Sequence, residues 1–450
     1  MRNDSRVKHA VALALCCCSA LAQTNSGTYL LHDVRLIDGT GSLPIAHVDI
    51  GIENGKIAAV VTPRSGSRFT PHNQAVRLNL SGKTVMPGII NGHGHLGLID
   101  GTSVGPANYT PANIERQLSQ YERYGITTVL SLGLNKDLLY QLRAAQEKGD
   151  LGGATILTAD RGIGTPGGVP GVSVGPDQLY RPTTPEEARK DVREMAGRDP
   201  NLLKIWVDDN LHKLPAPNPA VAAAVIDEAH KLHLSVAAHV YYEVDAKRLL
   251  QEGVSIIAHS IRDREIDPDT ISLIKNRGIY YIPTLQLEES FYIYAGHPAW
   301  MDTALFRNAA NPTLLEQLNS PAYRDKVETD PTTAIHRRAL QTAMANLKKL
   351  SNAGAPIAFG TDSGANPYRI QGFAEHRELQ LMVEAGLTPL QAIRAATQEN
   401  ARMLHFDKET GTISVGKRAD LIVLDADPSK DIKNTRKIAM VFHDGREIKP

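Results

Sequence analysis

The stretch Val85-Met86-Pro87-Gly88-Ile89-Ile90-Asn91-Gly92-His93-Gly94-His95-Leu96 decides how the chain is interpreted. Residues 84–90 form a short apolar run bounded by glycine, which is typical of a buried parallel strand. Because side chains alternate along an extended chain, His93 and His95 point to the same side and can chelate one metal ion. A bare His-x-His pair is equally compatible with two loop histidines that bind no metal, so further ligands must come from the rest of the chain.

The composition points to small-molecule chemistry. The chain has 450 residues, 42% of them hydrophobic, and 49 basic residues balance 49 acidic ones. This balance provides no basic face for nucleic acid, so we expect a small-molecule substrate. An α/β barrel commonly takes about 250 residues or more, so the length predicts one large core with a small companion domain.

The N-terminus has the layout of a secretory signal peptide, residues 1–22. Arg2, Arg6 and Lys8 precede an apolar run that ends in Ala20-Leu21-Ala22, a small-residue cleavage site. The run is too short to span a membrane as a helix. All three cysteines lie inside it, so the mature chain would begin at Gln23 without a thiol and be exported, as a periplasmic or secreted protein. A lipoprotein anchor is the alternative, but Leu15 before Cys16 is not the small residue that lipid anchoring favours.

The two ends of the chain share a strand-like pattern with turns at Asn54-Gly55 and Asp444-Gly445. Neither end is large enough for a good core alone, so residues 23–83 and 406–450 are predicted to pair into one small β-sandwich. The expected strands are residues 30–37, 48–52, 56–61, 76–80, 411–415, 420–424 and 438–442.

The middle segment, residues 84–405, alternates strand-like and helical stretches. This alternation predicts a (β/α)8 TIM barrel, an α/β fold whose active site lies at the C-terminal ends of the strands. The expected strands are residues 84–90, 126–132, 155–158, 203–207, 235–239, 256–259, 280–284 and 357–359. The expected helices include residues 111–124, 138–148, 185–196, 220–232, 245–251 and 334–353.

Polar side chains follow or end several of these strands: Lys204, His239, His259 and Asp362. Each of them alone could be a buried polar residue with ordinary hydrogen bonds. Together with the histidine pair they occupy strands one, four, five, six and eight, which predicts convergence on one site. A lysine within an apolar strand is costly unless it is paired or modified.

From Tyr29 onward the chain resembles the amidohydrolase superfamily of metal-dependent hydrolases, and within it the prolidase-like and imidazolonepropionase-like branch. The matching motifs are Val85-Met86-Pro87-Gly88 before His93-x-His95, Tyr124-Gly125-Ile126-Thr127-Thr128-Val129, Lys204, His239, His259, Gly360-Thr361-Asp362 and the closing run Gly411 to Leu424. The resemblance implies two divalent metal ions. His93, His95 and Asp362 would hold one, His239 and His259 the other, and Lys204, carboxylated by carbon dioxide, would bridge both.

The implied chemistry is hydrolysis by a metal-bridging hydroxide. Two cations about 3.5–4 Å apart lower the pKa of a bridging water and polarise the bond that it attacks. Asp362 would take a proton during attack and pass it to the leaving nitrogen. Imidazole and carboxylate ligands favour zinc, although manganese, cobalt and iron also fit.

Other side chains near these strand ends are candidates for substrate contact. Tyr241 and Tyr242 follow His239, and a phenol there could stabilise an oxyanion; packing against the barrel rim is the alternative. Arg262 and Arg264 could bind a substrate carboxylate, or form surface ion pairs with neighbouring acids.

Residues 288–331 are too long for a plain connection and are rich in aromatic residues, including Tyr294 and Trp300. They are interpreted either as a lid that selects bulky apolar substrates or as a contact between subunits of a homo-oligomer.

Three classes of function remain. The favoured one is hydrolysis of a C–N amide bond in a dipeptide or N-acyl amino acid with a bulky apolar group. The second is hydrolysis of a cyclic amide, lactone or ester, including xenobiotics. The third is a barrel that binds a ligand without activity, which the full set of strand-end ligands argues against.

Overall fold

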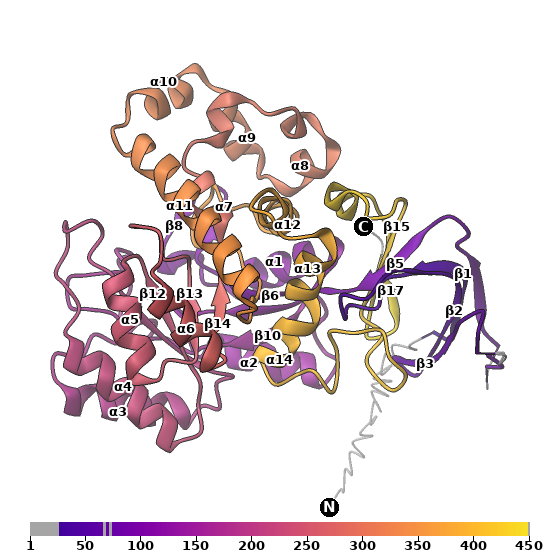
Figure 1. The fold of residues 1–450 in the computed structure, drawn as a ribbon, viewed down its shortest axis with the longest axis horizontal. Helices are drawn as coiled ribbons and strands as arrows, with labels where there is room; N and C mark the ends of the chain where they lie inside the picture. The colour runs from indigo at the N-terminus through magenta and orange to yellow at the C-terminus, as the bar shows by residue number, and fades with distance from the viewer. Residues whose placement is uncertain (1–26, 66–68, 72–73, 449–450) are drawn as a thin grey trace, which may run out of the picture.

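The computed structural model describes residues 27–65, 69–71 and 74–448. It consists of a barrel, a sheet built from both ends of the chain, and a lobe of short helices around α8, α9 and α10 (Figure 1). The signal peptide predicted for residues 1–22 lies outside the described residues and stays a prediction. Within the described part of the chain, no helix combines the length and the apolar character needed to cross a membrane.

Seven parallel strands and one irregular segment form the central ring. Regular pairing joins β6, β9 and β10 in one group and β11 to β14 in another. Ile163 pairs with Ile205 and connects the groups, while residues 357–363 pair with Tyr281 of β14 and Gly94 of β6. The ring therefore closes, and the predicted (β/α)8 barrel is confirmed. The strands are β6 (Ile89–Gly94), β9 (Ile126–Ser131), β10 (Thr155–Thr158), β11 (Leu203–Val207), β12 (Val236–Val240), β13 (Ile256–Ala258) and β14 (Tyr280–Ile282).

A long helix follows each ring segment, directly or after an insertion. Local signals define their starts: in α3 the Thr184 side chain accepts a hydrogen bond from the Glu187 backbone and Pro185 occupies the first turn, the capping box expected there. The helices are α1 (Pro111–Arg123), α2 (Leu138–Glu147), α3 (Pro185–Ala196), α4 (Pro219–Lys231), α5 (Glu243–Glu252), α6 (Pro268–Asn276), α11 (Thr332–Ala353) and α12 (Phe373–Glu384). After them come α13 (Pro389–Arg394), a π-helical turn (Ala395–Glu399) and α14 (Asn400–Met403).

The terminal segments form one hydrogen-bonded sheet of eight strands, in the order β17-β16-β15-β5-β1-β2-β3 with β4 beside β1. Its hydrophobic core combines residues of both chain ends, such as Val34 and Ile50 with Leu421 and Phe442. Neither end could bury this surface alone. The strands are β1 (Tyr29–Leu36), β2 (Ile45–Glu53), β3 (Lys56–Val61), β4 (Val76–Asn79), β5 (Thr84–Pro87), β15 (Leu421–Leu424), β16 (Ile438–His443) and β17 (Arg446–Ile448).

Three strand predictions were wrong in detail. Residues 357–359, predicted as a strand, belong to the irregular segment of the ring. Residues 84–90 are two strands, because β5 pairs with β15 of the terminal sheet and β6 enters the barrel. The chain crosses between them at Gly88, where an added Cβ would lie 2.3 Å from the Thr127 Oγ1 atom. Residues 411–415 are irregular, because Gly411 has a φ of +86° and an added Cβ would lie 2.5 Å from the Ala401 Cβ.

The long segment after β14 is a compact helical lobe rather than an open loop. Tyr294, Trp300 and Phe306 pack against one another and against Phe373 of α12, with ring centroids 4.8–5.9 Å apart. These aromatic side chains therefore attach the lobe to the barrel. The lobe contains α7 (Leu285–Glu289), α8 (Ala304–Ala309), α9 (Pro312–Asn319), α10 (Pro321–Thr329) and two 3-10 turns (Ile293–Gly296 and Ala299–Asp302).

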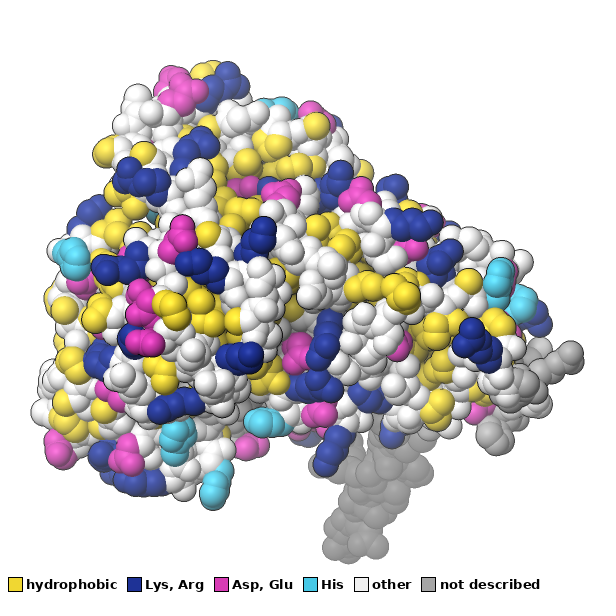
Figure 2. Space-filling model, viewed as in Figure 1, with side chains coloured by type: hydrophobic (Ala, Val, Ile, Leu, Met, Phe, Trp, Pro, Cys, Tyr) yellow, Lys and Arg dark blue, Asp and Glu magenta, His cyan; other side chains and the backbone are white. Residues whose placement is uncertain are grey.

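On the face shown in Figure 2, basic and acidic side chains are interspersed. This face has no large region of a single sign, in keeping with the equal numbers of basic and acidic residues.

Candidate metal centre and its cavity

The ring brings together the six side chains that the strand-end pattern singled out. Ligand atoms of His93, His259 and Asp362 all lie within 4.8 Å of one another. The His259 ring centroid is 4.4 Å from that of His93 and 4.3 Å from that of His239. His95 joins them through its Nε2 atom, 2.9 Å from Asp362 Oδ1.

Several nitrogen atoms at this point have no hydrogen-bond partner among the described residues. They are both ring nitrogens of His93, Nδ1 of His95 and Nζ of Lys204, and all are buried. His93 Nε2 lies 3.2 Å from Asp362 Oδ1. Since buried polar groups are almost always satisfied, this set of nitrogens around a carboxylate fits a bound cation.

The surroundings shift the pKa values of these groups towards the protonation states that bind metal. Burial lowers the pKa of His93 and His259 well below the usual value, so both imidazoles are neutral, the form that binds metal. Burial lowers the pKa of Lys204 to about 7. Burial alone would raise the pKa of Asp362, but the adjacent Arg369 and the histidines hold it well below its ordinary range. Asp362 is therefore a carboxylate.

Hydrogen bonds define which nitrogen of two histidines stays free. His239 Nε2 donates to Asp208 Oδ2 at 2.9 Å. Burial alone would raise the pKa of Asp208, but this hydrogen bond and the charges of His239 and Arg262 lower it, so Asp208 is a carboxylate. His259 Nδ1 lies 2.8 Å from Thr284 Oγ1. Each imidazole keeps its other nitrogen for a ligand bond, the usual arrangement around metal-bound histidine.

A buried carboxylate holds the first and last ring segments together. Glu375 is fully buried and accepts hydrogen bonds from Asn91, Thr361 and Ser363 at 2.8, 2.8 and 2.6 Å. Asp362 itself has a φ of +58°, a strained conformation for a residue other than glycine. The Glu375 bonds on both sides of it help to hold that conformation.

The centre opens into a cavity of about 360 Å³, within the usual range for a small-molecule site. One wall is apolar: Leu98, Leu134 and Trp206 line it and form a cluster with Leu179. We call these four residues the apolar wall. The polar part of the lining includes Tyr241, Arg262, Glu288, His336 and Arg369.

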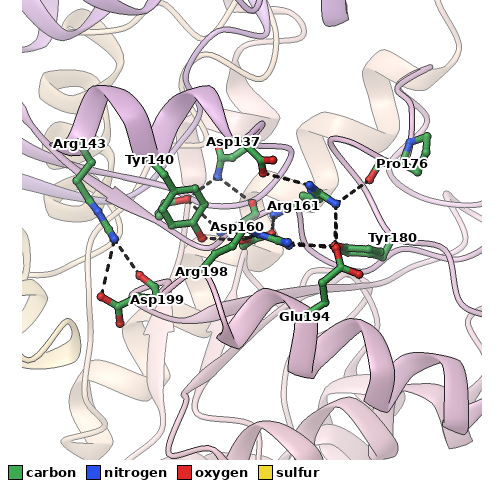
Figure 3. A network of polar contacts seen from close by, with 12 residues as sticks. Asp137, Tyr140, Arg143, Asp160, Arg161, Pro176, Tyr180, Glu194, Arg198 and Asp199 are labelled. Carbon is green, nitrogen blue, oxygen red and sulfur yellow. Dashed lines mark hydrogen bonds and ion pairs between the residues drawn. The ribbon is translucent and has the colours of Figure 1, made fainter. Parts of the chain in front are cut away.

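The glycine-rich loop after β10 completes the apolar side, where Val169 and Pro170 line the cavity. A polar network anchors the base of this loop (Figure 3). In it, Arg198 binds both oxygens of Asp160 at 2.8 and 2.9 Å and the Tyr180 hydroxyl at 2.9 Å. The loop is thus held at both of its ends while its middle faces the cavity.

The predicted substrate residues are only partly at the cavity. Tyr241 and Arg262 line it. Tyr242 lies outside the cavity lining and donates instead to Asp209 at 3.0 Å, and the Arg264 side chain is 70% exposed beside Asp263. The Tyr242 ring stacks on His212, and Arg264 forms a surface ion pair with Asp263.

Tyr294 and Trp300 also lie outside the cavity lining. Tyr294 is 1% exposed and its hydroxyl donates to the Tyr368 carbonyl oxygen at 2.5 Å. The physical reason is that these aromatic rings are used in the core of the lobe. Phe291 is the aromatic residue of this segment that does line the cavity.

Four ionisable residues of the cavity lining were not predicted as site residues: Asp208, Glu288, His336 and Arg369. Asp208 directly follows β11, so the strand-end argument could have included it. Glu288 lies on α7, the first helix of the lobe, and His336 lies on α11, which follows the lobe, so no periodicity brings them together. Their convergence depends on how the inserted segment folds.

Comparison with known proteins identifies a family model, the amidohydrolase family, that matches residues 84–448. Ochratoxinase of Aspergillus niger is 28% identical over 269 residues, covering 57% of this chain and 48% of the relative. An uncharacterized protein of Mycobacterium tuberculosis is 27% identical over 218 residues, covering 47% of this chain and 50% of the relative. The chain thus spans about half the length of the curated relatives it matches.

Solved structures share the fold over nearly the whole chain. A Xaa-Pro dipeptidase with bound methionine superposes with a TM-score of 0.74 at 24% identity, covering 94% of this chain and 100% of that one. Molinate hydrolase superposes with a TM-score of 0.72 at 23% identity, covering 94% of each chain. At this identity the likeness shows a common fold.

Proposed function

The chain belongs to the amidohydrolase family, and from this premise we propose that it hydrolyses the C–N amide bond of a dipeptide or an N-acyl amino acid with a bulky apolar group. The observation that supports this most is the set of unpartnered, buried nitrogens around Asp362 at the bottom of a cavity with an apolar wall.

The donor set fits two divalent cations, with zinc favoured. His93, His95 and Asp362 would hold one and His239 and His259 the other, with Lys204 between them. Bound there, the metal supplies Lewis-acid polarisation of the carbonyl and makes water nucleophilic near neutral pH. Because burial lowers the pKa of Lys204 to about 7, much of its amine is neutral near pH 7 and can attack carbon dioxide, forming a carbamate and releasing one proton.

The chain's own groups provide proton transfer and charge stabilisation. Asp362, kept ionised by Arg369, accepts a proton from the attacking water and returns it to the leaving nitrogen. Burial raises the pKa of Tyr241, so its phenol stays protonated at neutral pH. From the cavity wall this O–H can donate to the carbonyl oxygen as negative charge develops on it.

The function is tested by a substrate panel. Purified protein reconstituted with zinc is incubated with dipeptides, N-acyl amino acids and lactones, and products are identified by mass spectrometry. Amide cleavage with free amine release is expected. Turnover of lactones alone would contradict the proposed substrate class and favour the cyclic ester alternative.

We expect the apolar wall to discriminate between substrates by the size of their side chain. Leu134→Ala should lower kcat/KM for an N-acyl phenylalanine roughly tenfold or more, since a fully buried Leu side chain contributes about 1.5–3 kcal/mol. An N-acyl glycine should be affected much less, because it does not reach the wall. Trp300→Ala is the matched control: it should lower the Tm and change both substrates by the same factor. If Trp300→Ala changed the ratio of the two kcat/KM values more than Leu134→Ala does, the lobe rather than the apolar wall would determine substrate size.

Metal affinity is expected to depend on Asp208. Asp208→Asn removes the anionic acceptor of the His239 Nε2 proton, and loss of such a partner weakens metal binding roughly 10–100-fold. The neighbour Asp209→Asn is the control, because Asp209 contacts His212 and Tyr242 instead. Zinc affinity measured by competition with a chelator checks this, and equal affinities in the two variants would refute it.

We also propose that the protein acts after export, since the predicted signal peptide implies a periplasmic or secreted location. N-terminal sequencing of the protein from its native host tests this.

A further inference from the structure

Three polar side chains of the cavity lining are joined in a chain. Glu288 joins Arg262 to His336: its Oε1 atom accepts from Arg262 Nε at 2.6 Å and its Oε2 atom lies 2.7 Å from His336 Nδ1. The side chains of Arg262 and Glu288 are 6% and 5% exposed, and that of His336 is 21% exposed. We call these three residues the polar triad.

The triad is held rigidly. Arg262 Nη1 donates to the Val240 and Ser260 carbonyl oxygens, both at 2.8 Å, and its guanidinium carbon lies 4.7 Å from the centroid of the Tyr241 ring. The His336 ring stacks on Phe291 at 4.0 Å with an interplanar angle of 15°. These contacts leave little freedom for either side chain to rotate.

Stability alone does not account for this arrangement. A buried ion pair is costly to desolvate and is often no more stabilising than an apolar replacement of the same size. A buried pair in a cavity wall is a typical feature of a functional site.

The unused hydrogen-bonding capacity of the triad identifies the ligand. Among the described residues, the bonds of Arg262 use Nε and Nη1 and leave Nη2 without a partner, while His336 keeps Nε2. Glu288 has both oxygens occupied. The remaining capacity on this wall is therefore a cationic donor.

The other two carboxylates of the cavity lining also have hydrogen-bond or ion-pair partners. Asp208 accepts from His239, and Asp362 is paired with Arg369 and His95. No carboxylate of the cavity lining is thus without a partner within the part of the chain that the structure describes. A substrate ammonium group would have to displace an existing pair, whereas a substrate carboxylate would find Arg262 Nη2 free.

We infer that the polar triad binds the free carboxylate of the substrate, with Arg262 Nη2 as the charged donor and the His336 Nε2 side of the ring as the second polar contact. This inference rests on the proposed amide hydrolysis and assigns the residues that recognise the free carboxylate of the amine that is released. Glu288 orients both donors and is a positioning residue.

The test compares N-acetylphenylalanine with its carboxamide. In both compounds the measured reaction is hydrolysis of the same N-acetyl amide bond. The wild-type zinc-loaded protein should prefer the acid in kcat/KM by roughly tenfold to a hundredfold, the value of a hydrogen bond to a charged group, mostly through KM. His336→Gln should reduce the preference severalfold. The double variant Arg262→Gln/Glu288→Gln, which replaces the ion pair by a neutral pair and so avoids an isolated buried charge, should abolish it.

Arg264→Gln is the matched control, because that side chain is 70% exposed and lies outside the cavity lining. It should retain the full preference for the acid. Equal loss of activity on acid and carboxamide in the triad variants would show a structural role and overturn the inference, as would a wild type without preference for the acid.

A binding measurement separates this inference from the proposed function. Calorimetric titration of the wild type with N-acetylphenylalanine and with its carboxamide reports the carboxylate site even if neither is cleaved. Tighter binding of the acid, lost in the double variant, together with no turnover would refute only the proposed hydrolysis. Cleavage of both compounds with equal affinities would refute only the carboxylate site.

Discussion

Replacement of Lys204 by methionine is expected to lower kcat/KM for amide hydrolysis by roughly a thousandfold or more, since metal polarisation of a reacting bond is worth several kcal/mol and each 1.4 kcal/mol is tenfold in rate. Lys204 is fully buried in β11, and its Nζ atom has no hydrogen-bond partner among the described residues. The amine is therefore unexplained by packing and is free to carry the carbamate that would bridge two metals.

Methionine makes this a specific test. It has a similar length and no charge, so it should keep the strand packed while removing the nitrogen. The Tm of Lys204→Met should equal or exceed that of the wild type, because a buried amine is costly to desolvate. Retention of more than a tenth of the wild-type kcat/KM by a folded Lys204→Met protein would exclude a role for this side chain in the metal centre.

Asp362→Asn is expected to lower kcat roughly a hundredfold to ten-thousandfold, the range for loss of a positioned proton-transfer group. Asparagine has nearly the same shape but cannot accept the proton and carries no charge to match Arg369. The carboxyl group of Asp362 is ionised in the native protein, since Arg369 and the histidines hold its pKa well below the ordinary range. The check is the steady-state kcat for N-acetylphenylalanine, measured together with the metal content of the variant.

The control for Asp362→Asn is Asp209→Asn, which changes a carboxylate that lies outside the cavity lining. Its kcat should match that of the wild type. If Asp362→Asn binds the same amount of metal and turns over at the wild-type rate, the assignment of proton transfer to Asp362 is wrong.

Local signals made much of the fold predictable from the sequence. The range 185–196 was predicted to the residue, because a capping threonine, a first-turn proline and an acidic first turn mark its start. The strand predicted at residues 84–90 was less predictable, because its apolar run contains β5 of the terminal sheet and the first residues of β6 in the barrel. Only the tertiary contact at Gly88, where backbone passes close to Thr127, separates them.

The same distinction holds at the site. The ring geometry of parallel strands made it possible to predict that Lys204, His239, His259 and Asp362 converge on the histidine pair. Glu288 and His336 are brought together by the fold of the lobe, which has no comparable regularity. Tyr294 and Trp300 lie in the core that attaches the lobe to α12, and aromatic content alone cannot distinguish such a core from a substrate pocket.

We propose that the strand ends hold a metal centre in which Lys204 would bridge two ions. The most direct measurement is a zinc titration of metal-free protein, followed by the metal content per chain and by amide hydrolysis in the same samples. We expect activity to rise until about two zinc ions are bound per chain, as in other two-metal hydrolytic sites, and Lys204→Met to bind fewer. Saturation of both activity and binding at one zinc per chain, in the wild type and in Lys204→Met alike, would contradict it.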